Sequence, residues 1–233
     1  STSRDFALVK TGASNMMMKW KRGNSESYVN LFSFDNAGTF TSTKSQRVTV
    51  SSYGYTDLIK GPGNLYISAE QGYKRRDNVN KWGLLVSTLS TDGKDDVHVV
   101  DTERMTQNVT DNTTSYYRSP SITALNDSIY AIGYRGYSYD GFIETFKVET
   151  SGKITRLKSY EYDVNESNYN KLVRVDSNTV AMIYRGFKGQ WGGHVLTFDI
   201  ATDGSSITEV ASKLLHNSGD FFDTDLIHLR DDM

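Results

Sequence analysis

Chemically reactive side chains are the first feature to test in this sequence, and their spacing excludes several kinds of site. None of the four histidines lies three to five residues from another, so the chain has no zinc-type pair. No Gly-x-Ser-x-Gly motif marks a nucleophilic serine. The acidic runs at 92–96 and 220–225 lack the twelve-residue calcium-loop pattern with its terminal Glu. The sequence therefore predicts no catalytic residue, no metal site and no cofactor.

Three arginines precede a glycine at one position of a repeated pattern, namely Arg22, Arg135 and Arg185. In one interpretation each guanidinium bonds loop carbonyls or an acid of the neighbouring repeat and fixes how the repeats register. In the other, the three form a ring at the mouth of a channel and receive an anionic ligand. Gln71 occupies this position in one repeat and interrupts the ring, which favours registration.

Aromatic side chains gather in the segments that follow these glycines. Exposed rings among Gly, Ser and Asp stack on sugars or anchor a protein partner. Alternatively, they cover the edges of the repeats and fill gaps between loops. The sequence gives five ligand-binding candidates of this kind: Tyr73, Tyr137, Tyr139, Phe187 and Trp191.

Four Asn-x-Ser/Thr sequons are candidate glycosylation sites: Asn108, Asn112, Asn126 and Asn165. Each is a weak signal, because a chain rich in Ser and Thr produces some sequons by chance. Two of them fall in the inserted segment 95–117, where a glycan has room. They favour an extracellular or surface-associated localisation.

Composition narrows the classes that remain. The formal net charge is -2 with no long run of one sign, so a nucleic-acid partner is not expected. No stretch approaches the roughly 20 apolar residues of a membrane span, so membrane insertion is not expected either. With 15 Tyr, 10 Phe and 19 Gly against 2 Pro, the chain favours twisted antiparallel sheet over helix.

An internal repeat supplies the elements that must position these residues. Four apolar segments each end in a glycine, at 16–23, 65–72, 129–136 and 179–186, and these glycines are 49, 64 and 50 residues apart. The two clearest copies read AIGYRGYSYDGFIETF and AMIYRGFKGQWGGHVLTF. A strand precedes each segment, and a third strand follows it and turns at Asx-Gly or Ser-Gly into a polar fourth strand. The repeat therefore predicts four antiparallel strands per copy.

Matching positions of the third strand carry large apolar residues, which indicates that each copy meets the same environment. Phe32, Phe146 and Phe198 fall at one place, with Ser87 as the exception. Two residues further along the same face the copies carry Phe34, Leu89, Val148 and Ile200.

A four-stranded antiparallel unit of about 50 residues in tandem resembles a β-propeller blade, and it is kelch-like in length only. The kelch double glycine and the Trp-Asp dipeptide are both absent, so we describe the blades as a "YRG…TF" type. The resemblance implies an all-β fold in a single domain over 1–233. The predicted blades cover 6–53, 54–118, 119–169 and 170–221, with a partial fifth at 222–233.

The partial fifth blade raises the question of how the propeller closes. We expect a fragment of a longer propeller, a strand exchanged with a neighbouring subunit, or a terminal strand that packs differently. A donated strand would make assembly by β-augmentation natural. A protein partner or self-assembly is therefore expected, with a glycan as a further ligand.

These observations predict a non-catalytic extracellular or surface propeller that acts as a structural and interaction scaffold within a larger assembly, and not an enzyme. The alternative is a carbohydrate-binding, lectin-like propeller that uses the loop aromatics. A polysaccharide-acting enzyme ranks third, because it needs two converging carboxylates that sequence alone does not place.

Overall fold

The computed structural model describes residues 6–22, 26–42, 45–50, 52–76, 79–91, 96–105 and 118–217. These residues form antiparallel strands joined by turns, with a short 3-10 helix, η1 (Tyr137–Tyr139), between two of the strands. The all-β prediction is confirmed. Within this part of the chain no helix has the length and apolar character needed to cross a membrane.

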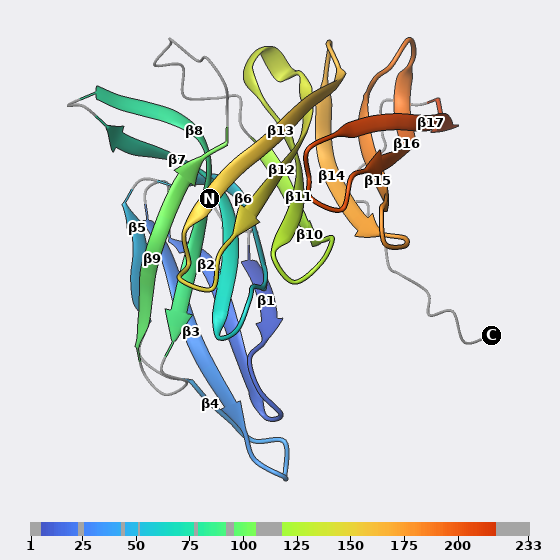
Figure 1. Cartoon of the computed structure of the whole chain (residues 1–233). Coiled ribbons are helices and arrows are strands. Elements are labelled where there is room, and N and C mark those ends of the chain that lie inside the picture. Colours follow the sequence, from blue (N-terminus) through green and yellow to red (C-terminus); the bar gives the residue numbers. More distant parts are fainter. Residues whose placement is uncertain are drawn as a thin grey trace. The chain divides into compact units, whose positions relative to one another are not determined.

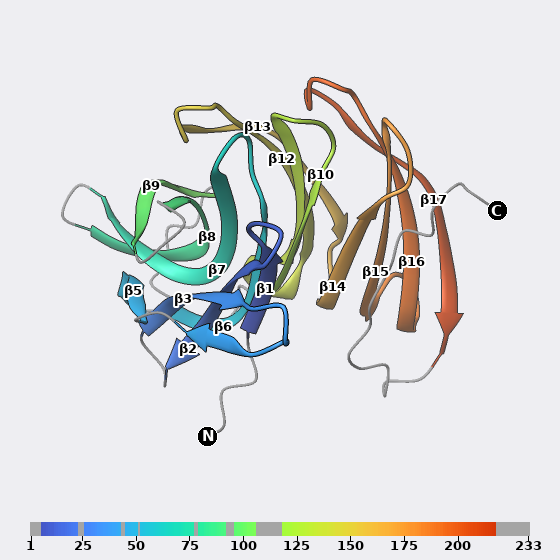
Figure 2. The ribbon, with the colours of Figure 1, turned by 90° about the horizontal axis from the view of Figure 1, so that it is seen from below.

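Four sheets succeed one another along the described chain (Figures 1 and 2). The first contains β1 (Phe6–Lys10), β2 (Asn15–Arg22), β3 (Glu26–Phe34), β4 (Phe40–Ser42) and β5 (Gln46–Val50). Both β4 and β5 pair with β3, so together they occupy the place of one fourth strand. The second contains β6 (Ser52–Lys60), β7 (Leu65–Arg76), β8 (Val79–Thr91) and β9 (Val97–Arg104).

The other two sheets keep the same up-and-down order. The third contains β10 (Arg118–Ala124), β11 (Ile129–Arg135), β12 (Gly141–Val148) and β13 (Ile154–Asp163). The fourth contains β14 (Ser167–Arg174), β15 (Thr179–Phe187), β16 (Trp191–Ile200) and β17 (Ile207–His216). The predicted partial blade at 222–233 lies outside the described residues.

The chain divides into two compact units, which are described separately below. The first comprises Ser1–Thr114 and Val148–Ile154, and so holds the sheets β1–β5 and β6–β9. The second comprises Ser115–Lys147 and Thr155–Met233, and so holds most of β10–β13 and all of β14–β17.

Face-to-face packing of two sheets forms the core of each unit. In the first unit, Met17 and Leu31 of β1–β5 join Tyr66 and Leu89 of β6–β9 in one buried cluster. Alternation along a strand sends every second side chain to the same face, so these contacts define which face of each sheet is covered. We call the face of β6–β9 that carries Leu89 its front face, and the opposite face its back face.

The second unit repeats this arrangement. The front face of β14–β17 carries Val180 and Phe198, and it packs on Ile129 and Ile143 from the back face of β10–β13. Phe198 has no exposed surface, and neither does Leu89 in the first unit. Front face against back face is therefore the contact that recurs within both units, as the repeat predicts.

The strand register corrects one alignment made from the sequence. Tyr66, Tyr130 and Val180 are equivalent, because each lies six residues before the recurring glycine of its sheet. Their partners on the next strand are Leu89, Phe146 and Phe198, respectively. Leu89, not Ser87, therefore occupies the phenylalanine position of the second sheet. Ser87 looked like an exception because the sequence alignment had placed Leu89 with Phe34, Val148 and Ile200, two residues too far along the strand.

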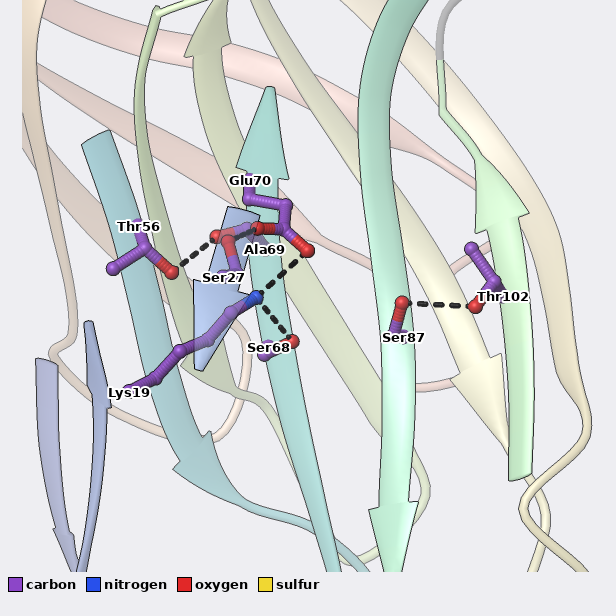
Figure 3. A network of polar contacts seen from close by, with 8 residues as sticks. All are labelled: Lys19, Ser27, Thr56, Ser68, Ala69, Glu70, Ser87 and Thr102. Carbon is purple, nitrogen blue, oxygen red and sulfur yellow. Dashed lines mark hydrogen bonds and ion pairs between the residues drawn. The ribbon is translucent and has the colours of Figure 1, made fainter. Parts of the chain in front are cut away.

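A buried polar network crosses between the two sheets of the first unit (Figure 3). The Lys19 ammonium on β2 lies 2.9 Å from a carboxylate oxygen of Glu70 on β7 and donates to the Ser68 hydroxyl at 3.0 Å. The Ser27 hydroxyl donates to the other oxygen of Glu70. Lys19 and Glu70 are each only 1% exposed. Because the charges neutralise each other and are hydrogen-bonded, the interface accommodates two ions that would otherwise be costly to bury.

Breaking this pair on one side tests how far the interface depends on it. We expect Glu70→Gln to lower the free energy of unfolding by about 3 to 5 kcal/mol, because it leaves the Lys19 charge buried without compensation. The double variant Lys19→Met/Glu70→Leu should recover most of that loss. Urea denaturation followed by circular dichroism measures both.

The exposed pair between Arg47 and Glu26, at 3.0 Å, provides the matched control. Arg47 is 53% exposed, so Arg47→Met should cost less than about 1 kcal/mol. A double variant less stable than Glu70→Gln would contradict the interpretation that an uncompensated charge causes the loss.

Candidate active site

Three connections meet at one end of the second unit. They are the segment from Gly136 to Asp140 between β11 and β12, the turn at 164–166 between β13 and β14, and the turn at 188–190 between β15 and β16. Antiparallel order brings them together, since β11, β13 and β15 all end where β12, β14 and β16 begin. We call this the loop end of the second unit.

Three carboxyl groups interact at this end. Asp140 precedes β12, while Glu161 and Asp163 lie in the last residues of β13. Burial, the charges of Glu161 and Asp163, and a hydrogen bond with Glu161 together raise the pKa of Asp140 from its usual 3.8 to about 6, with burial the largest cause. Asp140 is half-buried and Glu161 is exposed, so both carboxyl groups are accessible from solvent.

Asp163 is held in place from two sides. It is 3% exposed, and it accepts hydrogen bonds from the Tyr184 hydroxyl and the Asn165 backbone amide, both at 2.9 Å. Burial and the nearby Asp163 charge raise the pKa of Tyr184, so this hydroxyl remains a donor. The His194 ring stacks on Tyr184 with centroids 5.3 Å apart and an interplanar angle of 25°. Asp163 is therefore a fixed negative charge beside Asp140.

Tyr162 supports the same corner from the core side. Its ring meets that of Tyr184 edge-on at 5.0 Å, and its hydroxyl lies 2.5 Å from Ser167 and 2.6 Å from Asn170. Burial raises the pKa of this phenol well above its usual range. Asn170 donates onward to the Ser119 carbonyl at 3.3 Å, which joins β14 to β10. The two strands lie side by side in both views of the ribbon (Figures 1 and 2).

Arg135 bridges the two sheets of this unit. Its guanidinium donates to the Asn168 side-chain oxygen at 2.6 Å, and Asn168 donates to Glu166 at 2.5 Å. The same guanidinium lies 4.7 Å from the centroid of the Tyr139 ring. Through its hydrogen bond with Asn168, Arg135 contacts a side-chain amide of the neighbouring sheet rather than a loop carbonyl or an acid, and its role in registration stays a prediction. The guanidinium of Arg185 lies 5.8 Å from the ring centroid of Trp191, so both arginines support an aromatic ring.

The register places Arg22 differently from these two arginines. Met16 pairs with Phe32, just as Val180 pairs with Phe198, so Met16 and Val180 are equivalent positions. Five residues after them come Lys21 and Arg185, which are therefore equivalent to each other. Arg22 therefore occupies the backbone position of the recurring glycine in its sheet, paired with Glu26. Its side chain lies outside the described residues.

Glycine recurs at this position because side chains and backbone crowd it. A Cβ on Gly186 would collide with the Glu166 backbone oxygen and with the Tyr184 ring. A Cβ on Gly136 would collide with the Phe142 ring. The glycine that follows Tyr-Arg thus allows the loop end to close over the sheet.

The segment between β11 and β12 has an unusual backbone. Ser138 and Tyr139 both have positive φ, at 55° and 76°. Left-handed conformations cost free energy for residues with a side chain, and they concentrate where function constrains the backbone. This conformation places Tyr139, which is 41% exposed, directly before Asp140.

The predicted aromatic residues fall into two groups. Tyr139 and Trp191 lie at the loop end, Trp191 is 40% exposed, and Phe187 packs edge-on against it at 5.6 Å. Tyr137 belongs to η1 and Tyr73 to β7, but their side chains lie outside the described residues.

Two of the four predicted glycosylation sites can be located. Asn126 lies in the exposed turn between β10 and β11, where its amide donates to the Thr202 carbonyl at 2.8 Å. Asn165 lies in the turn between β13 and β14, where its amide donates to the Phe187 carbonyl at 3.2 Å. Asn108 and Asn112 lie outside the described residues. Glycosylation remains a prediction at all four.

Sequence reasoning did not identify Asp140, Glu161 or Asp163. Their spacing has no recognisable motif, because Asp140 belongs to one connection and the other two lie at the end of a strand, 21 and 23 residues later. The available signal was weak: acidic residues alternate at the end of β13 in the sequence YEYD. Among the described residues, no group of three or more His, Asp or Glu is arranged to hold a metal ion.

Comparison with solved structures identifies the fold as a β-propeller. Sqt1 of Saccharomyces cerevisiae is similar with a TM-score of 0.54 and 8% identity, over 91% of this chain and 48% of that one. The GH32 β-fructofuranosidase BmSUC1 of Bombyx mori gives 0.54 and 9%, over 91% and 50%. The subtype N10 neuraminidase-like protein of A/little yellow-shouldered bat gives 0.50 and 9%, over 89% and 58%.

The chain thus spans about half the length of the solved propellers that it matches. No protein-family model matches it, and no curated protein matches it in sequence. At 8 to 9% identity these likenesses establish the fold alone.

These neighbours contradict the prediction of a non-catalytic scaffold that is not an enzyme. One of the three is a β-fructofuranosidase, and another is described as neuraminidase-like. The prediction relied on blade repetition and on missing catalytic motifs. Neither excludes an enzyme, because a single fold hosts both catalytic and non-catalytic proteins. A site assembled from separate connections also leaves no motif in the sequence.

The raised pKa of Asp140 predicts a pH-dependent effect on stability. Because the folded protein holds this proton more tightly than the unfolded chain, stability is lost as pH rises from about 3.8 through about 6. Asp140→Asn mimics the protonated group. The variant should therefore equal the parent in Tm near pH 4 and exceed it above pH 6, as measured by thermal unfolding across this range.

Asp176, on a turn of the same unit, provides a control of opposite sign. Hydrogen bonds from the Asn178 and Thr179 amides lower the pKa of Asp176, so Asp176→Ala should lower the Tm at neutral pH, with the loss shrinking in acid. An Asp140→Asn variant that is no more stable than the parent at pH 7 would contradict the raised pKa of Asp140.

Proposed function

We propose that this chain is a β-propeller enzyme that hydrolyses a glycosidic bond at the loop end of the second unit. The observation that carries the proposal is the cluster of Asp140, Glu161 and Asp163, in which burial and the two neighbouring carboxyl groups raise the pKa of Asp140 to about 6. Pairs of carboxyl groups with different affinities for a proton supply the acid and the base in most glycoside hydrolases. The β-fructofuranosidase among the similar structures supports the choice of reaction.

The roles follow from exposure and charge. Asp140 is the general acid, because a pKa of about 6 keeps its carboxyl protonated in mild acid and ready to donate to a departing sugar oxygen. Glu161 is the exposed partner and is hydrogen-bonded to Asp140, so a sugar that enters between them must separate the two carboxyl groups before Glu161 acts as base or nucleophile. Asp163 is a positioning residue, because its buried charge, held by Tyr184, raises the pKa of Asp140.

The aromatic rings supply the binding surface for a sugar. Tyr139 is adjacent to Asp140 in sequence and rests on the Arg135 guanidinium, so an exposed ring stands beside the acid. Trp191 presents a second exposed ring, from the first residue of β16. Flat apolar rings with polar edges suit the apolar faces of pyranose and furanose rings.

Hydrolysis of a panel of glycosides tests the proposal. We expect the 233-residue chain to release reducing sugar from at least one fructoside, sialoside or hexoside polymer, and Asp140→Asn to lower kcat by about 10²- to 10⁴-fold. Asp127→Asn, in an exposed turn at the opposite end of the same sheet, is the matched control and should keep full activity.

The pH profile separates an acid catalyst from a merely structural residue. Activity should fall as pH rises through about 6, where Asp140 loses its proton, and Asp163→Asn should move that limb to lower pH by removing a neighbouring charge. Binding of a glycan without hydrolysis, or an alkaline limb unchanged in Asp163→Asn, would contradict the assignment.

Two finer features remain proposals of the same kind. We propose that the blades form a type of their own, marked by Tyr-Arg-Gly before the loop and Thr-Phe after it; the crowding at Gly136 and Gly186 supports this. We also propose an extracellular or surface setting, which the exposed sequons at Asn126 and Asn165 support.

A further inference from the structure

The front face of β1–β5 carries an apolar surface that no other described sheet of its unit covers. Phe32 pairs with Met16 and points away from the cluster formed by Met17 and Leu31, because neighbours along a strand face opposite ways. Aromatic side chains dominate this face. Phe34 is 36% exposed and Phe40 is 62% exposed.

These side chains already form an ordered array. Phe40 packs against Phe34 at 6.0 Å and against Phe32 at 6.1 Å between ring centroids. Trp20 stacks on Tyr28 at 5.1 Å. The edge of the same face is extended by Phe6 and Leu8 of β1, which are 63% and 47% exposed. Contiguous apolar surface of this kind is typical of a docking site in a soluble protein.

Equivalent residues elsewhere in the chain show what such a face accommodates. Phe198 occupies the position of Phe32, and Ile200 that of Phe34, on the front face of β14–β17. Both have no exposed surface, because the back face of β10–β13 covers them. In the first unit, the back face of β1–β5 covers Leu89 in the same way. The front face of a sheet in this protein therefore accommodates the back face of another sheet of the same repeat.

The back face of β14–β17 is the corresponding surface in the second unit. It carries Val173, Ala181, Val195 and Thr197, which are half-buried and lie on the side opposite Leu196 and Phe198. Lys171 pairs with Ile183 and Lys213 pairs with Val195, so two exposed lysines share this face with the small and β-branched residues. The aliphatic positions are the part of the face that suits the aromatic front face of β1–β5.

We infer that the front face of β1–β5 docks onto the back face of β14–β17 from a second copy of this chain. Front-to-back packing already joins the two sheets within each unit, so a second copy of the chain supplies the complementary face. The contact is heterologous, front face to back face, and a two-fold arrangement of the pair forms two identical contacts.

Sedimentation velocity over a wide range of concentration measures the assembly. The parent chain should form a species of twice the 26.2 kDa mass at high concentration. Phe34→Asp/Phe40→Asp should abolish it, because two charges would be buried in an apolar contact, while circular dichroism stays unchanged. Val99→Asp, at a 42% exposed aliphatic residue of β9, is the matched control and should keep the dimer.

Mixing two impaired variants distinguishes this contact from other modes of dimerisation. Val173→Asp disables the back face and should also yield monomers. Because each variant retains one intact face, a mixture of Val173→Asp with Phe34→Asp/Phe40→Asp should restore a dimer with one copy of each. Dimers formed by pairing two front faces would not be restored in this way.

Three results would overturn the inference. They are a parent chain that stays monomeric at every concentration, a dimer that persists in Phe34→Asp/Phe40→Asp, and a mixture that does not reassemble. A monomer that instead binds oligosaccharide on this face would overturn it too. Glycosidase activity is measured separately, so failure of the dimer leaves the proposed active site to be judged on its own assay.

Discussion

Burial of one sheet's front face by another sheet's back face is the interaction on which the rest of this structure depends. A four-stranded antiparallel sheet with two apolar faces cannot shield either of them alone. In each unit, packing of two sheets removes Leu89 or Phe198 completely from water. Repetition of the sequence follows from this requirement, since each copy must present the same two faces.

The same interface also holds polar groups that the hydrophobic effect does not explain. Position for position, Glu70 in the second sheet corresponds to Tyr184 in the fourth, and each bonds a partner from the sheet it packs against. Glu70 meets the ammonium of Lys19, and Tyr184 donates to Asp163. In the second unit this contact places a buried carboxylate at the loop end, so the packing of the sheets and the proposed catalysis share one residue.

Sequence patterns predicted the fold better than the site. The recurring glycine and the phenylalanines at matched positions fixed the number and order of strands, because both reflect local crowding and burial that every copy repeats. The exposed rings of Tyr139 and Trp191 could be picked out from the sequence, since the segments after the glycine are part of the repeat, but their role in ligand binding stays a prediction. The alignment failed at Ser87, where only the pairing of Tyr66 with Leu89 reveals the register.

The carboxyl groups could not be found in this way, because Asp140 and Asp163 come together only through the folding of β12 and β13. No feature of either residue distinguishes it in sequence from a solvated acid in a turn. The pairing of Asn168 with Arg135 has the same origin, since it joins side chains 33 positions apart.

Equivalent substitutions at a covered and an uncovered front face test the central claim most directly. Phe198→Ala should lower the free energy of unfolding by about 3 to 5 kcal/mol, since it empties a fully buried site, and Phe32→Ala should cost less than half as much in dilute solution. Equal losses at the two positions, measured by urea denaturation, would contradict the account that coverage by a second sheet stabilises each repeat.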